Sequence, residues 1–263
     1  ISIPSSVVKF GEHIFLYDES VVLTGSIEVI KKNLFYNNTL REIIIPSSVK
    51  LIEPRSFENS VSLVSVTFMT PSKITSIPHH CFKRCLSLKK ISIPSSVTLI
   101  DFNAFEGCKS LDDIIFEVTS KVTKINSFCF KDCLSLTRIT IPSSVSLIDS
   151  NAFEGCKLMN RIIFEMPSNM TVIKSNLFIE LTLLKEITIP SSVTSIDSFA
   201  FSECSSLTKI VFEQPSSLTA IGHNAFNMCK SLKEFTIPRT VNSLGNNAFS
   251  GCSSLTHIEI PYQ

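Results

Sequence analysis

Residues Ile93 to Phe116 read IPSSVTLIDFNAFEGCKSLDDIIF, and this stretch recurs along the chain. A variant copy alternates with it, two residues longer at one place, so that coils of 23 and 25 residues together repeat every 48 residues. A fixed period of this length indicates a solenoid, in which each coil buries one face against its neighbours. The shorter coils begin at Ile45, Ile93, Ile141, Ile189 and Ile237, and the longer ones at Phe68, Phe116, Phe164 and Phe212.

Within a coil, the segment 88–93 alternates apolar and polar residues, which predicts a short strand with Ile91 and Ile93 facing inward. Pro94 lacks an N–H group and ends the strand. The segment 101–109 places capping residues before Ala-Phe and Gly-Cys after it, which predicts a single helical or 3₁₀ turn. The predicted fold class is an α/β repeat solenoid: a curved stack of about eleven coils, with a parallel β-sheet on one face and short helical or 3₁₀ turns on the other.

The composition narrows the class of protein further. Of the 263 residues 44% are hydrophobic and the mean hydropathy is +0.29, yet no apolar run is long enough to predict membrane insertion by this segment. The net charge is +1 without a basic cluster, which argues against nucleic acid as a partner. Because the composition does not change along the chain, residues 1–263 are predicted to form one domain. The chain opens and closes inside a repeat, so we expect a longer protein around it.

The pattern L-x-x-I-x-I-P-x-x-V-x-x-I-x-x-x-A-F-x-x-C-x-S-L covers essentially the whole chain and resembles the BspA-like class of leucine-rich repeats. It departs from the common leucine-rich signature by placing Pro directly after the strand. The resemblance implies a leucine-rich-repeat fold in a surface or secreted protein of a bacterium or a parasitic protist. It also implies adhesion: a cell-surface or extracellular location, and a protein partner such as a host extracellular-matrix or cell-surface protein.

Cysteine, phenylalanine and histidine are the residues that could be mistaken for a site. Seven of the nine cysteines share one repeat position, which Ser60 and Leu181 also occupy, so buried packing explains them better than metal ligation or disulfides. One Phe per coil predicts a stacked aromatic core, whereas Phe102, Phe128 and Phe199 lie outside that ladder and either cover the core edge or form a contact patch. His79 and His80 adjoin Cys81 but have no third partner at ligand spacing, which favours a loop.

No phosphate loop, nucleophile elbow or metal-binding helix occurs in the sequence, so we predict a non-enzymatic chain without cofactor or metal. The candidate protein-binding residues therefore lie on the outward strand face and at the two-residue insertions. One outward row is charged, and its neighbours of opposite sign could simply pair with each other. A second row mixes hydroxyl and β-branched apolar side chains, which either attract a partner or merely favour strands. The first row contains Lys90, Asp113, Arg138, Arg161, Glu186 and Lys209, and the second contains Ile115, Thr140, Ile163 and Val211.

Glu117, Glu165 and Glu213 recur at the insertions and predict an acidic rim, in which neighbours lie about 10 Å apart, too far to share one Ca²⁺. Asn37 and Asn169 fit the N-glycosylation acceptor pattern. The preferred hypothesis is a non-enzymatic protein-binding module of a cell-surface adhesin that uses the strand face and the rim. The alternative is an architectural spacer or scaffold that displays another domain, and an enzyme is the least favoured class.

Overall fold

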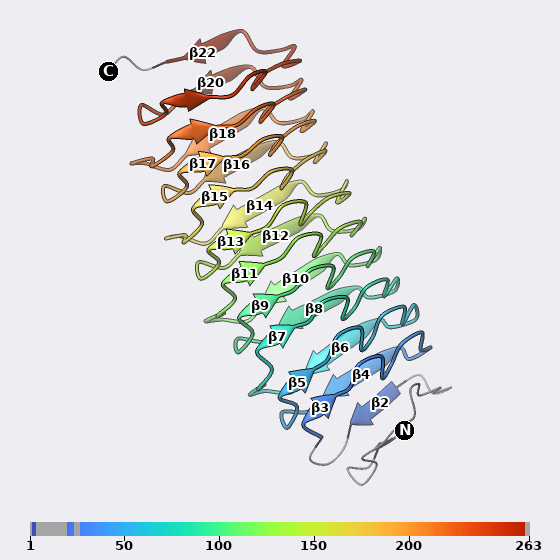
Figure 1. Ribbon diagram of the computed structural model, residues 1–263. Coiled ribbons are helices and arrows are strands. Elements are labelled where there is room, and N and C mark those ends of the chain that lie inside the picture. Colours follow the sequence, from blue (N-terminus) through green and yellow to red (C-terminus); the bar gives the residue numbers. More distant parts are fainter. Residues whose placement is uncertain (1, 4–19, 24–26, 261–263) are drawn as a thin grey trace. The chain divides into compact units, whose positions relative to one another are not determined.

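The computed structural model describes residues 2–3, 20–23 and 27–260. The first predicted coil, from Ile3, therefore lies almost wholly outside the described residues. The contacts divide the chain into two compact units, Ile1–Ser135 and Leu136–Gln263. Within each unit, successive coils stack strand upon strand (Figure 1). Each unit is a parallel-strand solenoid of the predicted kind.

In the first unit, the main sheet is parallel and has the order β1-β2-β4-β6-β8-β10 within the described residues. A second ladder of two-residue strands runs beside it, in which β3 pairs with β5, and β9 pairs with both β7 and β11. The main strands are β1 (Ser2–Ile3), β2 (Ser20–Leu23), β4 (Glu42–Ile45), β6 (Ser65–Phe68), β8 (Lys90–Ile93) and β10 (Asp113–Phe116). The short ones are β3 (Val29–Ile30), β5 (Leu51–Ile52), β7 (Ser76–Ile77), β9 (Leu99–Ile100) and β11 (Lys124–Ile125).

The second unit repeats this arrangement. Main strands pair in parallel as β12–β14, β16–β18 and β20–β22, and the two-residue strands pair as β15–β17–β19–β21. The main strands are β12 (Arg138–Ile141), β14 (Arg161–Phe164), β16 (Glu186–Ile189), β18 (Lys209–Phe212), β20 (Glu234–Thr236) and β22 (His257–Glu259). The short ones are β13 (Leu147–Ile148), β15 (Val172–Ile173), β17 (Ser195–Ile196), β19 (Ala220–Ile221) and β21 (Ser243–Leu244).

The predicted helical or 3₁₀ turns are wrong, because the described residues contain no helix. The N–H groups of Asn103, Phe105 and Gly107 donate to carbonyls of the following coil at 3.2, 2.9 and 2.7 Å. The N–H groups between them close tight turns onto their own coil. Asn103 and Gly107 are left-handed, with φ of 57° and 72°, which interrupts any right-handed winding. Every second N–H group thus donates to the next coil. It is therefore not available for the hydrogen bond within its own coil that a helix requires.

The inward rows form the core as predicted. Phe105 is fully buried and lies 5.4 Å from the ring of Phe82 and 5.5 Å from that of Phe130, measured between centroids. All nine cysteines are buried free thiols, and the Cys108 Sγ donates to the Phe82 carbonyl at 3.0 Å. Ser60 occupies the same slot and its hydroxyl donates to the Phe35 carbonyl at 2.6 Å. The slot therefore selects a small side chain that can donate a hydrogen bond, although Leu181 shows that the donor is dispensable.

Candidate protein-binding surface

On the first unit, the outward positions of the main strands carry the predicted charged row. Lys90 lies directly opposite Asp113 in the β8–β10 register, and its Nζ is 3.4 Å from the Asp113 Oδ2. The Lys90 side chain remains 59% exposed. This pair follows the self-pairing alternative, and such an exposed ion pair stabilises a fold by at most about 1 kcal/mol.

On the second unit, the same row begins with two like charges. Arg138 lies opposite Arg161 in the β12–β14 register, so two guanidinium groups occupy neighbouring positions. Like charges placed opposite each other destabilise a sheet. Among the described residues, Arg161 forms no ion pair, whereas Arg138 has a partner. Glu186 lies opposite Lys209 in the β16–β18 register, and both are exposed. Self-pairing therefore explains only part of the row.

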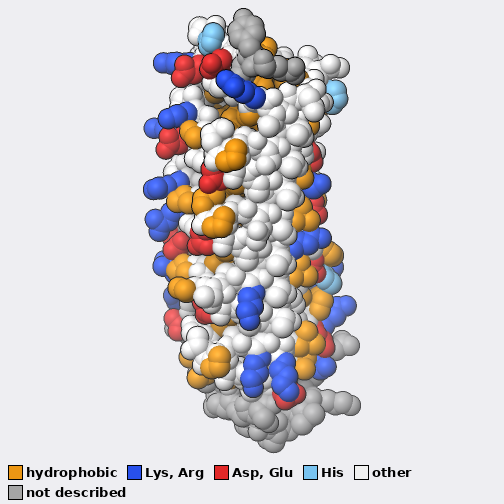
Figure 2. Space-filling view, turned by 90° about the vertical axis from the view of Figure 1, so that its left-hand side faces the viewer, with side chains coloured by type: hydrophobic (Ala, Val, Ile, Leu, Met, Phe, Trp, Pro, Cys, Tyr) orange, Lys and Arg blue, Asp and Glu red, His pale blue; other side chains and the backbone are white. Residues whose placement is uncertain are grey.

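The second outward row exposes apolar side chains between hydroxyl groups. Ile115 is 40% exposed, Ile163 37% and Val211 38%. Ile163 lies opposite Thr140, and Val211 lies opposite Thr188. Along the edges of the face drawn in Figure 2, hydrophobic side chains lie among charges of both signs. The strand faces of both units thus offer apolar contacts beside charges, a composition that suits a protein partner.

The glutamates of the predicted acidic rim are tied into the stack. Glu117 Oε2 accepts the backbone N–H of Ser95 at 2.9 Å, and Glu165 Oε2 accepts that of Ser143 at 3.2 Å. Glu213 Oε2 accepts both the N–H and the hydroxyl of Ser191, at 2.9 and 2.8 Å. Hydrogen bonds from the Ser191 backbone and side chain hold the pKa of Glu213 below its ordinary value.

Each of these glutamates therefore joins a longer coil to the shorter coil before it. The sequence predicts the recurrence of the glutamates but not this contact, because Ser and Glu lie 22 residues apart. The recurring I-P-S-S turn opposite each glutamate was the available signal. Met69 occupies the equivalent position in the remaining insertion, where it is 49% exposed.

The turns opposite the sheet hold the remaining aromatic and histidine residues. His79 stacks on Phe102 with ring centroids 5.0 Å apart, and its Nδ1 is 3.7 Å from the Asp101 Oδ2. Phe102 is 43% exposed and Phe199 is 42% exposed, so neither is a core residue. Phe128 lies under the ammonium of Lys131, which is 5.2 Å from its ring centroid. Phe102 and Phe199 are therefore exposed on these turns, and whether they cover the core edge or form a contact patch stays a prediction.

Both asparagines of the glycosylation pattern are exposed. Asn38, beside Asn37, is buried, and its Oδ1 accepts the Leu40 N–H at 2.8 Å. In the described residues, no three His, Cys, Asp or Glu side chains gather closely enough to hold a metal ion. The described part of the chain also lacks any helix long and apolar enough to span a membrane.

Comparison with known proteins finds the same architecture. A family model described as "BspA type Leucine rich repeat region (6 copies)" matches residues 1–112, 28–160 and 157–263. No curated protein sequence matches the chain significantly.

Three solved structures of bacterial proteins share the fold. The pneumococcal vaccine antigen PcpA is 20% identical, with a TM-score of 0.61 over 91% of this chain and 71% of its own. A leucine-rich repeat protein of Eubacterium ventriosum is 21% identical, with a TM-score of 0.63 over 93% of this chain and 66% of its own. A leucine-rich repeat protein of Bacteroides ovatus is 22% identical, with a TM-score of 0.54 over 94% and 82%. The chain thus spans about two thirds of the first two proteins, and these identities support the fold alone.

Proposed function

Because the chain belongs to the BspA-type leucine-rich repeat family, we propose that it is a non-enzymatic protein-binding module that engages an extracellular protein through its outward strand faces. The observation that carries the proposal is the exposure of Ile115, Ile163 and Val211 on those faces, at 37 to 40%. Burying such side chains against a partner gains roughly 25 cal/mol per Å² of apolar surface. A regular stack of coils supplies many such positions, so the affinity is distributed over weak contacts.

Charge supplies the specificity. The pair Arg138 and Arg161 places two like charges side by side on the second unit, and Arg161 has no ion pair among the described residues. A carboxylate of the partner would relieve that repulsion and form a charge-assisted hydrogen bond. The acidic rim contributes less than its sequence pattern indicates, since Glu117, Glu165 and Glu213 already accept backbone hydrogen bonds.

A cell-surface location and an adhesive role belong to the same proposal. They are supported by the resemblance to a vaccine antigen, a protein that antibodies must reach. Host extracellular-matrix or cell-surface proteins are therefore the first partners to test. The alternative role, an architectural spacer, is favoured by the internal use of the glutamates, because it leaves the rim as part of the scaffold.

The experiment is a binding assay of the 263-residue chain against purified extracellular-matrix glycoproteins. A triple variant, Ile115→Lys, Ile163→Lys and Val211→Lys, should weaken binding by at least about tenfold, as expected when interface positions are lost. The matched control is Val61→Lys with Leu183→Lys, because these side chains are 41% and 43% exposed but lie outside the strands.

Reversing the charge at Arg138 and Arg161 together should weaken binding as well. If the bound glycoprotein is held equally tightly by the strand-face variants and by the control, the assignment of the strand face is wrong. If the chain binds none of the glycoproteins, the spacer role is supported instead.

A further inference from the structure

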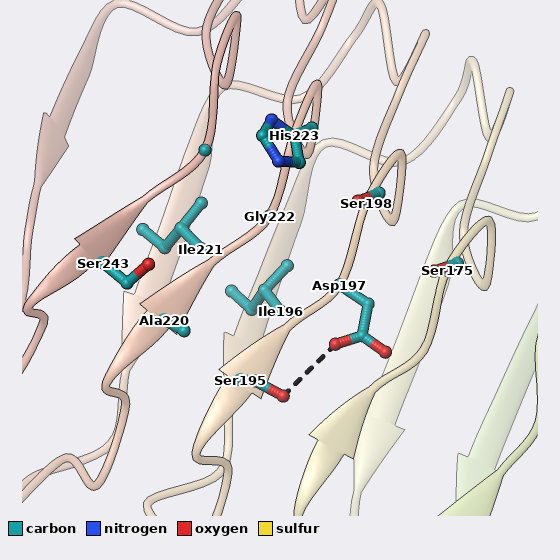
Figure 3. Close-up of a pocket in the computed structure, with 11 residues that line it drawn as sticks. Ser175, Ser195, Ile196, Asp197, Ser198, Ala220, Ile221, Gly222, His223 and Ser243 are labelled. Carbon is teal, nitrogen blue, oxygen red and sulfur yellow. Dashed lines mark hydrogen bonds between the residues drawn. The ribbon is translucent and has the colours of Figure 1, made fainter.

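A groove of about 230 Å³ opens on the second unit, beside the two-residue strands rather than on the main sheet. Four successive coils line it, those of β15, β17, β19 and β21. Figure 3 shows Ser195 and Asp197 on one coil, Gly222 and His223 on the next, and Ser243 on the third. The groove therefore has no residue in common with the candidate protein-binding surface.

Two glycines line this groove. The residue directly after each two-residue strand usually carries a polar side chain, as Asp101, Asn126 and Asp197 do. In the β19 and β21 coils that residue is Gly222 and Gly245. A Cβ atom on Gly222 would lie 2.6 Å from the Ser198 nitrogen, so the backbones of the two coils come close here and only glycine fits.

Because Gly222 has no side chain, Asp197 lacks a hydrogen-bond donor that Asp101 has in the first unit. In the first unit, the Asn126 amide donates to the Asp101 Oδ1 at 2.7 Å. Gly222 occupies the position of Asn126 relative to Asp197, so this hydrogen bond has no equivalent. Asp197 instead accepts the Ser195 hydroxyl at 3.3 Å, and the Lys174 Nζ is 3.9 Å from its other oxygen. A hydrogen-bond donor on a ligand can therefore bind Asp197 in the way that the Asn126 amide binds Asp101.

His223 supplies a hydrogen-bond donor, in contrast to the acceptor at Asp197. Its Nδ1 accepts the backbone N–H of Asn246 at 2.9 Å, so in the neutral ring the proton is on Nε2 and can be donated to a ligand. Ile196 and Ile221, both 1% exposed, lie between the polar groups (Figure 3). The groove thus offers a carboxylate acceptor, an imidazole donor and serine hydroxyls above the buried side chains of Ile196 and Ile221.

We propose that this groove binds a single sugar residue through its hydroxyl groups. A sugar hydroxyl both donates and accepts, so the hydroxyl groups of one sugar offer partners to a carboxylate and to an imidazole alike. The Asp197 carboxylate disfavours an anionic ligand. The Lys174 ammonium beside it already balances its charge, so a cationic ligand is not needed either. The volume holds about seven or eight water molecules, which suits one ring but not a peptide segment.

The proposal is tested by titrating the ¹⁵N-labelled 263-residue chain with the methyl glycosides of glucose, galactose, mannose and N-acetylglucosamine. The chain has only seven glycines, so the amide signals of Gly222 and Gly245 are readily resolved. We expect a saturable shift of both signals with at least one sugar.

Two variants replace the recognition groups by residues that other coils carry at the same positions, so both should fold. These are Asp197→Asn, as at Asn126, and His223→Ser, as at Ser198. Each should weaken binding at least about tenfold, as for the loss of one charge-assisted or directed hydrogen bond. The matched control is Asp101→Asn in the first unit, which should leave the affinity unchanged.

Three results would overturn the proposal. The first is the absence of a saturable shift at Gly222 and Gly245 with all four sugars up to about 50 mM, a concentration that detects even very weak sites. The second is equal affinity in Asp197→Asn and in the unsubstituted chain. The third is a shift produced by calcium chloride and by none of the sugars. None of these results bears on the strand-face proposal, because the two surfaces share no residue.

Discussion

Replacing Met69 by Glu should stabilise the first unit, because the backbone is already arranged to receive the carboxylate. The N–H of Glu117 donates to the Ile93 carbonyl at 3.0 Å, and that of Met69 donates to the Ile45 carbonyl at 2.9 Å. The backbone therefore takes the same course after the strand at Met69 as at Glu117. Ser47 stands where Ser95 donates its N–H to Glu117, but Met69 offers it no acceptor.

The magnitude follows from the exposure of the site. A side-chain acceptor for a free backbone N–H at a helix start contributes about 1 kcal/mol, and buried hydrogen bonds to charged groups contribute more. Met69 is 49% exposed, so solvent competes for the bond and part of the apolar contact of the Met side chain is lost. We expect a net gain of about 0.5–1 kcal/mol, or about 1–4 °C in Tm for a domain of this size.

The assay is urea denaturation followed by circular dichroism at about pH 7 and pH 3, with Met69→Gln as the uncharged control. Glu213 shows that this contact lowers the pKa of the carboxylate. The added stability should therefore be present above the unfolded-state pKa and disappear as the pH falls through the folded-state pKa. A variant no more stable than the natural chain at pH 7, or one that keeps its gain at pH 3, would show that the glutamates do not act through this bond.

Three further substitutions test other contacts. Desolvation by burial, together with Lys83 and Arg55, lowers the pKa of His80, so the natural chain should lose stability as the pH falls below the unfolded-state value. His80→Asn, which suits the left-handed φ of 56°, should remove that loss in urea denaturation at several pH values; an unchanged pH profile would contradict it. Cys108→Ser keeps a hydrogen-bond donor for the Phe82 carbonyl, so its free energy of unfolding should exceed that of Cys108→Ala by about 0.5–1.5 kcal/mol. The reverse order would refute a stabilising role for the hydrogen bond of the thiol. Gly222→Ala should cost about 1–3 kcal/mol in the same assay, since its Cβ would meet the adjacent backbone; a neutral result would contradict the close approach.

The strands and the core were predictable because their signals are local and repeated. Period-two alternation identified the inward residues Ile91 and Ile93, and both are at most 1% exposed. The stack of Phe105 between Phe82 and Phe130 follows from placing one Phe at the same position of every coil. Whether residues 1–263 form a single domain stays a prediction beside the division at residue 135.

The turns and the second ladder were not predictable in the same way. A capping residue followed by Ala-Phe is equally compatible with a helical turn and with hydrogen bonds to the next coil. The decision depends on where each N–H group finds its acceptor, and that acceptor lies about one coil away. The recurrence of Asn103, Asn151 and Gly107 at left-handed positions was the local signal against a helix.

The candidate sites were predictable only in part. Outward strand positions follow from the alternation, so the exposure of Ile115 and Ile163 agrees with the expectation, while their use in binding stays a prediction. The groove at Asp197 and His223 was missed, because residues of four different coils line it. A glycine at a position that elsewhere carries a side chain was the available signal.

The hydrogen bond between each insertion glutamate and the preceding serine also bears on how many residues such a repeat chain can gain or lose without losing these contacts. Glu117 and Glu165 each require a Ser-bearing shorter coil immediately before them. Deleting a shorter coil alone would place a glutamate next to another longer coil, where no serine of an I-P-S-S turn can donate to it. Recombination that adds or removes 48 residues, a shorter coil together with the longer one that follows it, keeps every remaining pair of glutamate and serine.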